Sequence, residues 1–260
     1  MKELLQKCLK AAGKIQKDHF EGIKMISHKE NISNIVTEVD FECNSTIVQM
    51  IVKEHPDHNL LTEEEGWINN QSAYTWVVDP LDGTSNYVAW IPWFGVLIAL
   101  LKDNEPVLGG AYLPIQNDLY FAEKGKGAYK NGGKLKITDK RLSNSLSACS
   151  TDFNEDQQAL DKAISYYGFL VNNSRNIRST NSLLDFLYVA ENKYGCCVNM
   201  FTHIWDIAAP FMIIKEAGGS FQGQANHEID YSIDEKILVK NYPVIAGMYD
   251  IVHKMKHQIP

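Results

Sequence analysis

The hexapeptide D-P-L-D-G-T, which begins at residue 79, combines residue types that could hold a metal ion and a phosphate group. It follows the apolar run W-V-V, which is typical of a buried strand. Pro80 fixes its own φ angle and biases Asp79 toward an extended conformation, so the chain leaves the strand in a defined direction. Gly83 permits backbone shapes that other residues resist, and Thr84 can start a helical turn. Asp79 and Asp82 could then converge on a cation, beside backbone N–H groups that suit an anion.

Further acids lie elsewhere in the sequence. Glu63, Glu64 and Glu65 directly follow an apolar run, and strand ends of α/β proteins are where ligand groups gather. Asp40 lies in a segment with helical periodicity, and Asp206 stands at the start of another. Each acid also has an ordinary explanation when it is taken alone. Acidic runs are commonly solvated, a lone acid on an amphipathic helix commonly faces water, and Asp206 would serve as a helix N-cap.

Together these motifs resemble the inositol monophosphatase family of magnesium-dependent, lithium-sensitive phosphomonoesterases. The resemblance rests on V-T-E-V-D, T-E-E, D-P-L-D-G-T and W-D-I-A-A in that order, with K-G-K-G-A-Y-K-N-G between the last two. It extends from about residue 1 to the C-terminus. The fold that it implies is a layered αβαβα sandwich, and the protein that it implies is a homodimer.

The resemblance assigns a role to each matched residue. The implied metal ligands are Glu64, Asp79, Asp82, Asp206 and the backbone carbonyl of Leu81. The implied catalytic residues are Asp40, Thr84 and Glu64, with Asp40 working together with Thr84. Phosphate or substrate contacts are expected from Asp82, Gly83, Thr84, Asn199, His203 and Asp206. Lys29 matches a lysine that the family often uses near the site, and an exposed structural lysine is an equal alternative there.

The implied chemistry is hydrolysis of a phosphate monoester by metal-activated water. The ester is doubly anionic and repels hydroxide, whereas hard divalent cations with oxygen ligands, above all Mg²⁺, counter that charge. Two or three Mg²⁺ ions would lower the pKa of a bound water and stabilise the leaving oxygen. Thr84 and Asp40 would orient that water or take its proton. Because this chemistry needs no Ser or Cys nucleophile, we expect in-line attack without a covalent intermediate.

The substrate is less well defined than the reaction. Inositol monophosphate is the first candidate, but Asn199 stands where inositol-selective members tend to carry glutamate. Asn181 replaces a usual glycine, and Thr62 replaces the glycine of a G-E-E segment. Phosphatases of fructose 1,6-bisphosphate, NADP, histidinol phosphate or phosphoadenosine phosphate therefore stay open as alternatives. A carboxylate-rich metal-binding protein without turnover is the alternative outside enzymes.

Hydrophobic periodicity predicts the elements that position these residues. A first amphipathic helix follows from helical spacing of Leu4, Leu5, Cys8, Leu9, Ala12 and Ile15. Short strands are expected up to about residue 129, and strands alternate with helices after about residue 140. The helix near Asp206 is expected to begin at 206 to 208, because Pro210 suits a first turn. The prediction is an α/β protein with an α+β N-terminal half, 1–140, and an α/β C-terminal half, 141–260.

The overall composition restricts the partners. The 260 residues carry a net charge of −7, which argues against nucleic-acid binding and leaves a small phosphorylated substrate possible. We expect no membrane span, because no run of about 18 apolar residues is present. The five cysteines form no C-x-x-C pair and predict free thiols in a reducing cytoplasm.

Overall fold

The protein is described from a computed structural model. The residues that it describes are 1–20, 22, 26–28, 35–138, 140–151, 157–223, 229–234 and 236–258. Lys29, which was expected near the site, lies outside these residues.

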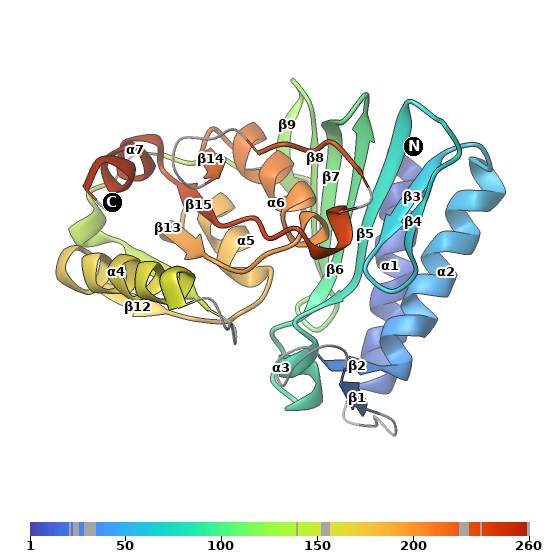
Figure 1. The fold of residues 1–260 in the computed structure, drawn as a ribbon, viewed down its shortest axis with the longest axis horizontal. Coiled ribbons are helices and arrows are strands. Elements are labelled where there is room, and N and C mark those ends of the chain that lie inside the picture. Colours follow the sequence, from blue (N-terminus) through green and yellow to red (C-terminus); the bar gives the residue numbers. More distant parts are fainter. Residues whose placement is uncertain are drawn as a thin grey trace.

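The described chain forms five layers, which alternate between helices and sheets (Figure 1). One outer layer holds α1 (Lys2–His19) and α2 (Glu38–Glu54), which pack on an eight-stranded sheet. The central layer holds α5 (Leu184–Ala190) and α6 (Ile204–Glu216). A five-stranded sheet follows, and its outer face carries α4 (Gln157–Asn173) and α7 (Tyr249–Gln258). This arrangement confirms the predicted αβαβα sandwich.

The larger sheet is mostly antiparallel and has the strand order β10-β9-β8-β7-β6-β5-β3-β4. Its strands are β3 (Asn59–Thr62), β4 (Gly66–Ile68), β5 (Tyr74–Asp82), β6 (Gly95–Lys102), β7 (Glu105–Leu113), β8 (Asp118–Glu123), β9 (Gly127–Lys130) and β10 (Gly133–Lys134). Strands β3 and β5 are the parallel pair. Asn131 and Gly132 both take positive φ angles between β9 and β10, which confirms the tight turn that N-G predicts there.

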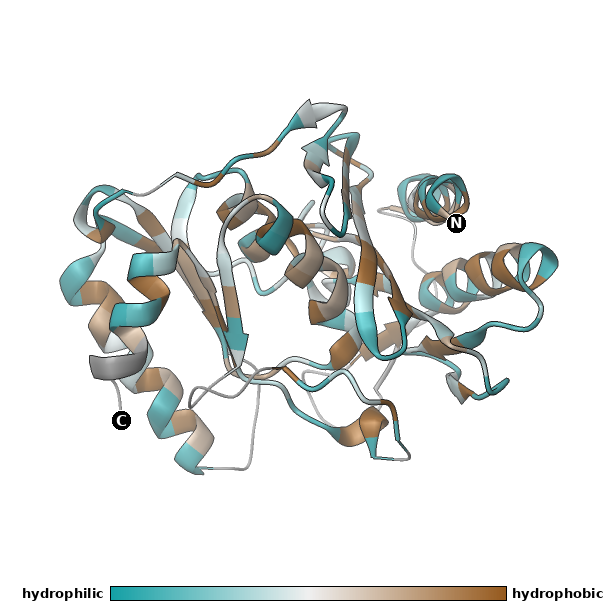
Figure 2. Ribbon diagram, turned by 90° about the horizontal axis from the view of Figure 1, so that it is seen from above, coloured by the Kyte–Doolittle hydropathy of each residue, from teal (hydrophilic) through white to brown (hydrophobic). Residues whose placement is uncertain are grey.

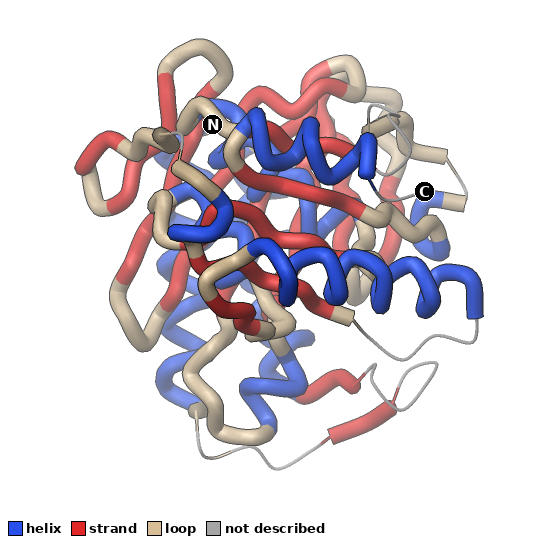
Figure 3. The backbone as a smooth tube through the Cα atoms, turned by 90° about the vertical axis from the view of Figure 1, so that its left-hand side faces the viewer, coloured by secondary structure: helices blue, strands red, loops and turns tan. Residues whose placement is uncertain are grey.

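The smaller sheet has the order β12-β11-β13-β15-β14 and mixes parallel and antiparallel pairs. Its strands are β11 (Leu146–Ser150), β12 (Asn176–Arg178), β13 (Tyr194–Asn199), β14 (Ser220–Gly223) and β15 (Val244–Gly247). Helices α4 and α7, which pack on its outer face, lie in front of it in Figure 3. The remaining elements are β1 (Ile26–His28), β2 (Ile35–Thr37), α3 (Thr84–Val88) and the 3₁₀ turns Leu142–Asn144 and Ile237–Val239.

Two apolar cores hold the layers together, one on each face of the larger sheet. The outer helices α1, α2, α4 and α7 mix apolar and polar residues along their length, as amphipathic helices do (Figure 2). Gly109 and Gly110 in β7 let helices approach from both sides. A Cβ on Gly109 would lie 2.7 Å from Met212 Cβ on α6, and one on Gly110 would lie 2.5 Å from Leu5 Cδ2 on α1. Helix α6 therefore packs directly on the larger sheet, although it follows residue 140 in the sequence.

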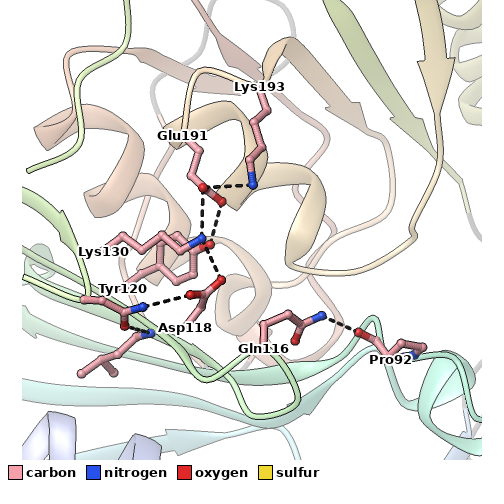
Figure 4. Close-up of polar contacts among 9 residues, drawn as sticks. Pro92, Gln116, Asp118, Tyr120, Lys130, Glu191 and Lys193 are labelled. Carbon is pink, nitrogen blue, oxygen red and sulfur yellow. Dashed lines mark hydrogen bonds and ion pairs between the residues drawn. The ribbon is translucent and has the colours of Figure 1, made fainter. Parts of the chain in front are cut away.

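A polar network joins the larger sheet to the end of α5 (Figure 4). The carboxylate of Glu191, which follows α5, accepts hydrogen bonds from Tyr120 Oη at 2.8 Å and from Lys130 Nζ at 3.0 Å. Lys193 Nζ lies 3.0 Å from the same carboxylate, and Lys130 also pairs with Asp118 at 2.7 Å. Burial raises the pKa of Glu191, but the bonds from Tyr120, Lys193 and Lys130 outweigh burial and lower it overall. The division into halves at residue 140 stays a prediction, and these contacts tie the two sides together.

All five cysteines are free, as predicted, and all five are buried. Within the described residues, no helix combines the length and apolarity that crossing a membrane requires.

Candidate metal centre

The predicted acids lie where β3 and β5 end. These strands are parallel, with Thr62 opposite Val78, so their carboxyl ends lie at the same edge of the sheet. The Glu63 N–H donates to the Val78 carbonyl at 3.1 Å, which holds the T-E-E segment beside the end of β5. The sequence order of strand, acid and turn therefore places two acidic motifs side by side.

The end of β5 contains a bulge. Asp79 pairs with Leu97 and Asp82 pairs with Gly95, so β5 carries one more residue than β6 between these pairs. The extra residue interrupts the ladder and redirects the chain, as bulges do near functional sites. Asp79 Oδ1 accepts the Leu81 N–H at 3.0 Å within this bulge. The two acids of the hexapeptide are thereby turned toward a common side.

Helix α6 adds the third acid. One carboxylate oxygen from each of Asp79, Asp82 and Asp206 lies within 4.8 Å of the others. Asp79 is 2% exposed, and the other two are half-buried. Sequence positions more than a hundred residues apart thus meet at a cluster that offers oxygen atoms alone, which suits hard divalent cations.

The electrostatics of the cluster fit a cation. Burial raises the pKa of Asp79 well above its ordinary range, and the charges of Glu63, Asp82, Asp206 and Asp40 raise it further. Like charges this close oppose one another's ionisation, whereas a bound cation favours the ionised forms. The residues present therefore fit a divalent metal site.

The structure places Glu63 close enough to the acid cluster to act on it electrostatically, although the family match assigned it no role. The charge of Glu63 raises the pKa of both Asp79 and Asp40. The family match pointed to the next residue, Glu64, whose role as a ligand stays a prediction. The hydrogen bond from Glu63 to β5 needs the parallel pairing of β3 and β5, and the sequence alone did not specify that pairing.

Asp40 and Thr84 lie together, as predicted. Asp40 Oδ2 accepts from both the N–H and the hydroxyl of Thr37, at 2.8 and 2.6 Å, and these bonds cap α2. Its other oxygen lies 3.1 Å from Thr84 Oγ1, which also lies 2.9 Å from the Leu81 carbonyl. Burial, opposed by the Thr37 bonds, raises the pKa of Asp40 to about 6. Asp40 thus has a pKa that suits a general base near neutral pH.

Gly83 is required by its backbone. Its φ of 86° lies in the left-handed region, and an added Cβ would lie 2.6 Å from the Trp93 carbonyl. Helix α3 starts directly after it, so Gly83 and Thr84 are both in the turn where phosphate contacts were expected. Asp82 Oδ1 accepts the N–H of Leu183 at 2.6 Å, which ties this turn to the residue before α5.

The start of α6 differs from the prediction. The helix begins at Ile204 rather than at 206 to 208, because Asp206 Oδ2 accepts the N–H of His203 at 2.6 Å and closes the first turn from within. Asp206 is therefore the third helical residue and not the N-cap, and Pro210 lies in the interior of the helix. With this earlier start of the helix, the backbone N–H of His203 is hydrogen-bonded to Asp206.

The predicted substrate residues lie around this turn and at the end of β13. The His203 ring stacks on Trp205, with centroids 4.7 Å apart. Asn199 ends β13, and its Oδ1 accepts the N–H of Phe201 at 3.0 Å. Asn181 has a φ of 50°, a conformation in which asparagine is a common substitute for glycine. Substrate contact by Asn199 and His203 stays a prediction.

Comparisons with known proteins agree with this geometry. A sequence profile described as "Inositol monophosphatase family" matches residues 1–256. The Nus factor SuhB of Haemophilus influenzae is 34% identical over 213 residues, which cover 81% of this chain and 79% of that protein. The fructose-1,6-bisphosphatase/inositol-1-monophosphatase of Aquifex aeolicus is 32% identical over 234 residues, which cover 81% of each. The crystal structure of the extragenic suppressor protein suhB from Bartonella henselae superposes with a TM-score of 0.86 at 25% identity, covering 98% of this chain and 96% of that one. With its acids gathered at the carboxyl ends of β3 and β5 and a match along nearly its whole length, the chain belongs to the inositol monophosphatase family.

Proposed function

We propose that the protein is a Mg²⁺-dependent phosphatase that hydrolyses a small polyol or sugar phosphate, with inositol monophosphate as the first candidate substrate. The observation that carries this proposal is the cluster of Asp79, Asp82 and Asp206, whose carboxylate oxygens lie within 4.8 Å of one another. Membership of a phosphatase family supports the reaction class. The name of the Aquifex relative, which includes both activities, keeps fructose 1,6-bisphosphate as the second candidate.

The metal would be held by the carboxylates of Asp79, Asp82 and Asp206, the Leu81 carbonyl and an acid of the T-E-E segment. We propose two or three Mg²⁺ ions there, and in that role Mg²⁺ supplies charge neutralisation and a lowered pKa for bound water. Asp82 and Asp206 are each held by one backbone N–H, from Leu183 and His203, at 2.6 Å. These bonds fix the direction of each carboxylate before any ligand arrives.

Asp40 and Thr84 would handle the proton of the attacking water. The Thr84 hydroxyl has one hydrogen and two acceptors within reach, Asp40 Oδ1 and the Leu81 carbonyl. If the Leu81 carbonyl serves as a metal ligand, the Thr84 hydroxyl would donate to Asp40, and the threonine oxygen would accept a hydrogen bond from water. Asp40 is anchored through Thr37 and can take up the proton in turn.

The cysteine thiols of this chain are poor candidates for a nucleophile that would form a covalent phosphoryl intermediate. Burial raises the pKa of each of the five cysteines, so none of them has the thiolate character of a nucleophile. We therefore infer that no cysteine forms a covalent intermediate, and we propose in-line attack by water on the basis of the family resemblance.

The test is phosphate release from a generic phosphomonoester with and without Mg²⁺. Asp82→Asn is expected to lower kcat by at least about 10²-fold, because the site loses one of its charged ligands. Asp18→Asn is the matched control, since Asp18 is an exposed acid on α1 that pairs with Lys14. Tight metal uptake by the wild-type protein without phosphate release would replace the proposal with the metal-binding alternative.

A panel of esters identifies the substrate. The panel compares kcat/KM at saturating Mg²⁺ for inositol monophosphate, fructose 1,6-bisphosphate, NADP, histidinol phosphate and phosphoadenosine phosphate.

The family resemblance also leads us to expect inhibition by Li⁺ in the millimolar range. Phosphate release that does not change with Li⁺ concentration would remove this expectation without affecting the reaction class.

We further propose that the protein is a cytoplasmic homodimer. Five free cysteines fit the reducing cytoplasm.

The surface proposed for the dimer contact follows α3. It consists of Trp90, Ile91 and Trp93, which are 61%, 36% and 40% exposed, and this is an unusual apolar surface for a monomer. A second copy of the chain is the proposed occupant. Trp93→Glu should convert a dimer to a monomer in light scattering, whereas Val239→Glu, at another exposed apolar residue, should not. A monomeric wild-type protein would refute this proposal.

A further inference from the structure

Gln16 is a polar residue in the middle of an apolar helix face. It lies on α1 in line with the buried residues Leu9, Ala12 and Gly13, and it is 0% exposed. A glutamine so deeply buried is costly unless its amide forms hydrogen bonds. The partners of that amide therefore indicate what the residue does.

The amide of Gln16 reaches the bulge of β5 from the side of α1. Its Nε2 donates to the Pro80 carbonyl at 2.8 Å and to the Gly95 carbonyl at 3.1 Å. These carbonyls belong to the two strands at the place where the ladder is interrupted between Asp79 and Asp82. Pro80 has no N–H to offer β6, so a side chain supplies donors that the ladder lacks there.

The bond to Pro80 fixes one peptide plane of the acidic hexapeptide. The carbonyl of the Pro80–Leu81 peptide accepts from Gln16, while the N–H of the same peptide donates to Asp79 Oδ1 at 3.0 Å. The plane is thus held at both ends. Its orientation sets the direction of the Asp79 carboxylate on one side and of the following Leu81 carbonyl on the other.

The backbone of Gln16 also forms a hydrogen bond to a side chain near the hexapeptide. Its backbone carbonyl accepts the hydroxyl of Tyr87 at 2.7 Å, and Tyr87 is a buried residue of α3. Helix α3 starts at Thr84, whose hydroxyl lies 2.9 Å from the Leu81 carbonyl. Both sides of the hexapeptide are therefore connected to the same residue of α1.

We propose that Gln16 is a positioning residue of the metal centre, which acts through the Pro80–Leu81 peptide to orient Asp79 and the Leu81 carbonyl. This inference rests on the proposed function, because it takes these two groups as metal ligands. Gln16 itself contacts neither metal nor substrate in this proposal.

The experiment is Mn²⁺ binding to metal-free protein, measured by the EPR signal of free Mn²⁺. Gln16→Met keeps the length and apolar packing of the side chain but removes both donors. We expect its Kd for Mn²⁺ to rise about tenfold. The Mg²⁺ concentration for half-maximal phosphate release should rise by a similar factor, while KM for the ester at saturating Mg²⁺ changes by less than about twofold.

The control separates positioning from general packing. Leu5→Val removes packing from the same face of α1, away from the hexapeptide, and should lower the thermal midpoint of metal-free protein without changing the Kd for Mn²⁺. Gln16→Asn keeps the amide but is one methylene shorter, so it decides the question if Gln16→Met does not fold. An unchanged Mn²⁺ affinity in a folded Gln16 variant would overturn the inference. Mn²⁺ binding by wild-type protein without phosphate release would overturn the proposed function alone, and no Mn²⁺ binding at all would overturn both.

Discussion

Removal of the Glu191 carboxylate should loosen the contact between the larger sheet and α5. The side chain of Glu191 is 12% exposed and accepts from Tyr120 and Lys130, which both belong to the larger sheet. In Glu191→Ala, the fully buried Tyr120 loses this acceptor, and Lys130 keeps Asp118 as its charged partner.

The magnitude follows from these contacts. A hydrogen bond to a charged group contributes about 1.5–3 kcal/mol, and a buried hydroxyl left without a partner costs about 1–3 kcal/mol. The two contributions together amount to about 2.5–6 kcal/mol. Because Lys130 retains Asp118, we expect a loss in the lower part of that range, about 3 kcal/mol. For a chain of this size that corresponds to a fall of about 6–12 °C in Tm.

The assay is thermal unfolding followed by circular dichroism, with denaturant unfolding as a second measure. Lys193→Met is the matched control, because its side chain is 51% exposed and its ion pair with Glu191 should contribute less than about 1 kcal/mol. A Tm for Glu191→Ala within about 2 °C of the wild-type value would refute the reasoning.

The pH dependence gives an independent check of the same carboxylate. The pKa of Glu191 in the folded protein lies below its ordinary value of 4.5, so the unfolded chain binds more protons near that pH. Its contribution is therefore fully present above pH 4.5 and is lost as the pH falls through the lowered folded pKa. The stability difference between wild type and Glu191→Gln should narrow over that acidic window. A difference that stays constant with pH would show that charge does not carry the effect.

Two further perturbations test local structure. Gly83→Ala should destabilise the fold by about 2–3 kcal/mol and abolish most Mg²⁺-dependent phosphate release, since its Cβ would meet the Trp93 carbonyl. Gly125→Ala is its control, with a positive φ but nothing within 4 Å, and equal losses in unfolding experiments on both would contradict the steric argument. Burial and the neighbouring His55 lower the pKa of His58, whose Nδ1 accepts from Trp76 Nε1 at 3.1 Å, whereas Asp57 raises it. Stability should therefore fall as the pH drops below 6.5, where the unfolded histidine takes up a proton first, and this fall should be smaller in His58→Gln over the same unfolding series.

The layered fold and the acids of the cluster were predicted through the resemblance to the family, and not from residue patterns alone. The residue patterns alone predicted acids at the ends of two strands, through the rule that ligand groups gather at carboxyl ends of strands. The capping of α2 by Thr37 and Asp40 is also local, because its partners lie three residues apart. This cap depends on neighbours in the chain and not on long-range packing.

Other features depended on contacts that periodicity does not reveal. Ile15 was assigned to the buried face of α1 because it is apolar, but it is half-buried, and Gln16 is the residue that the helix turns inward. The backbone bond that holds Glu63 beside β5 depends on the register of β3 against β5, which periodicity does not specify. The early start of α6 depends on a side chain that bonds backward to His203, which a proline-based rule does not anticipate.

Gly109 in β7 determines how closely α6 can approach the larger sheet. Its missing side chain lets the Ala209 carbonyl lie within 2.8 Å of where a Cβ would stand, so even one methyl group would push α6 outward. Asp206 travels with that helix, whereas Asp79 and Asp82 stay with the sheet. The separation of α6 from the larger sheet therefore determines how closely the carboxylate of Asp206 approaches those of Asp79 and Asp82. The absence of a side chain at position 109 keeps that separation small.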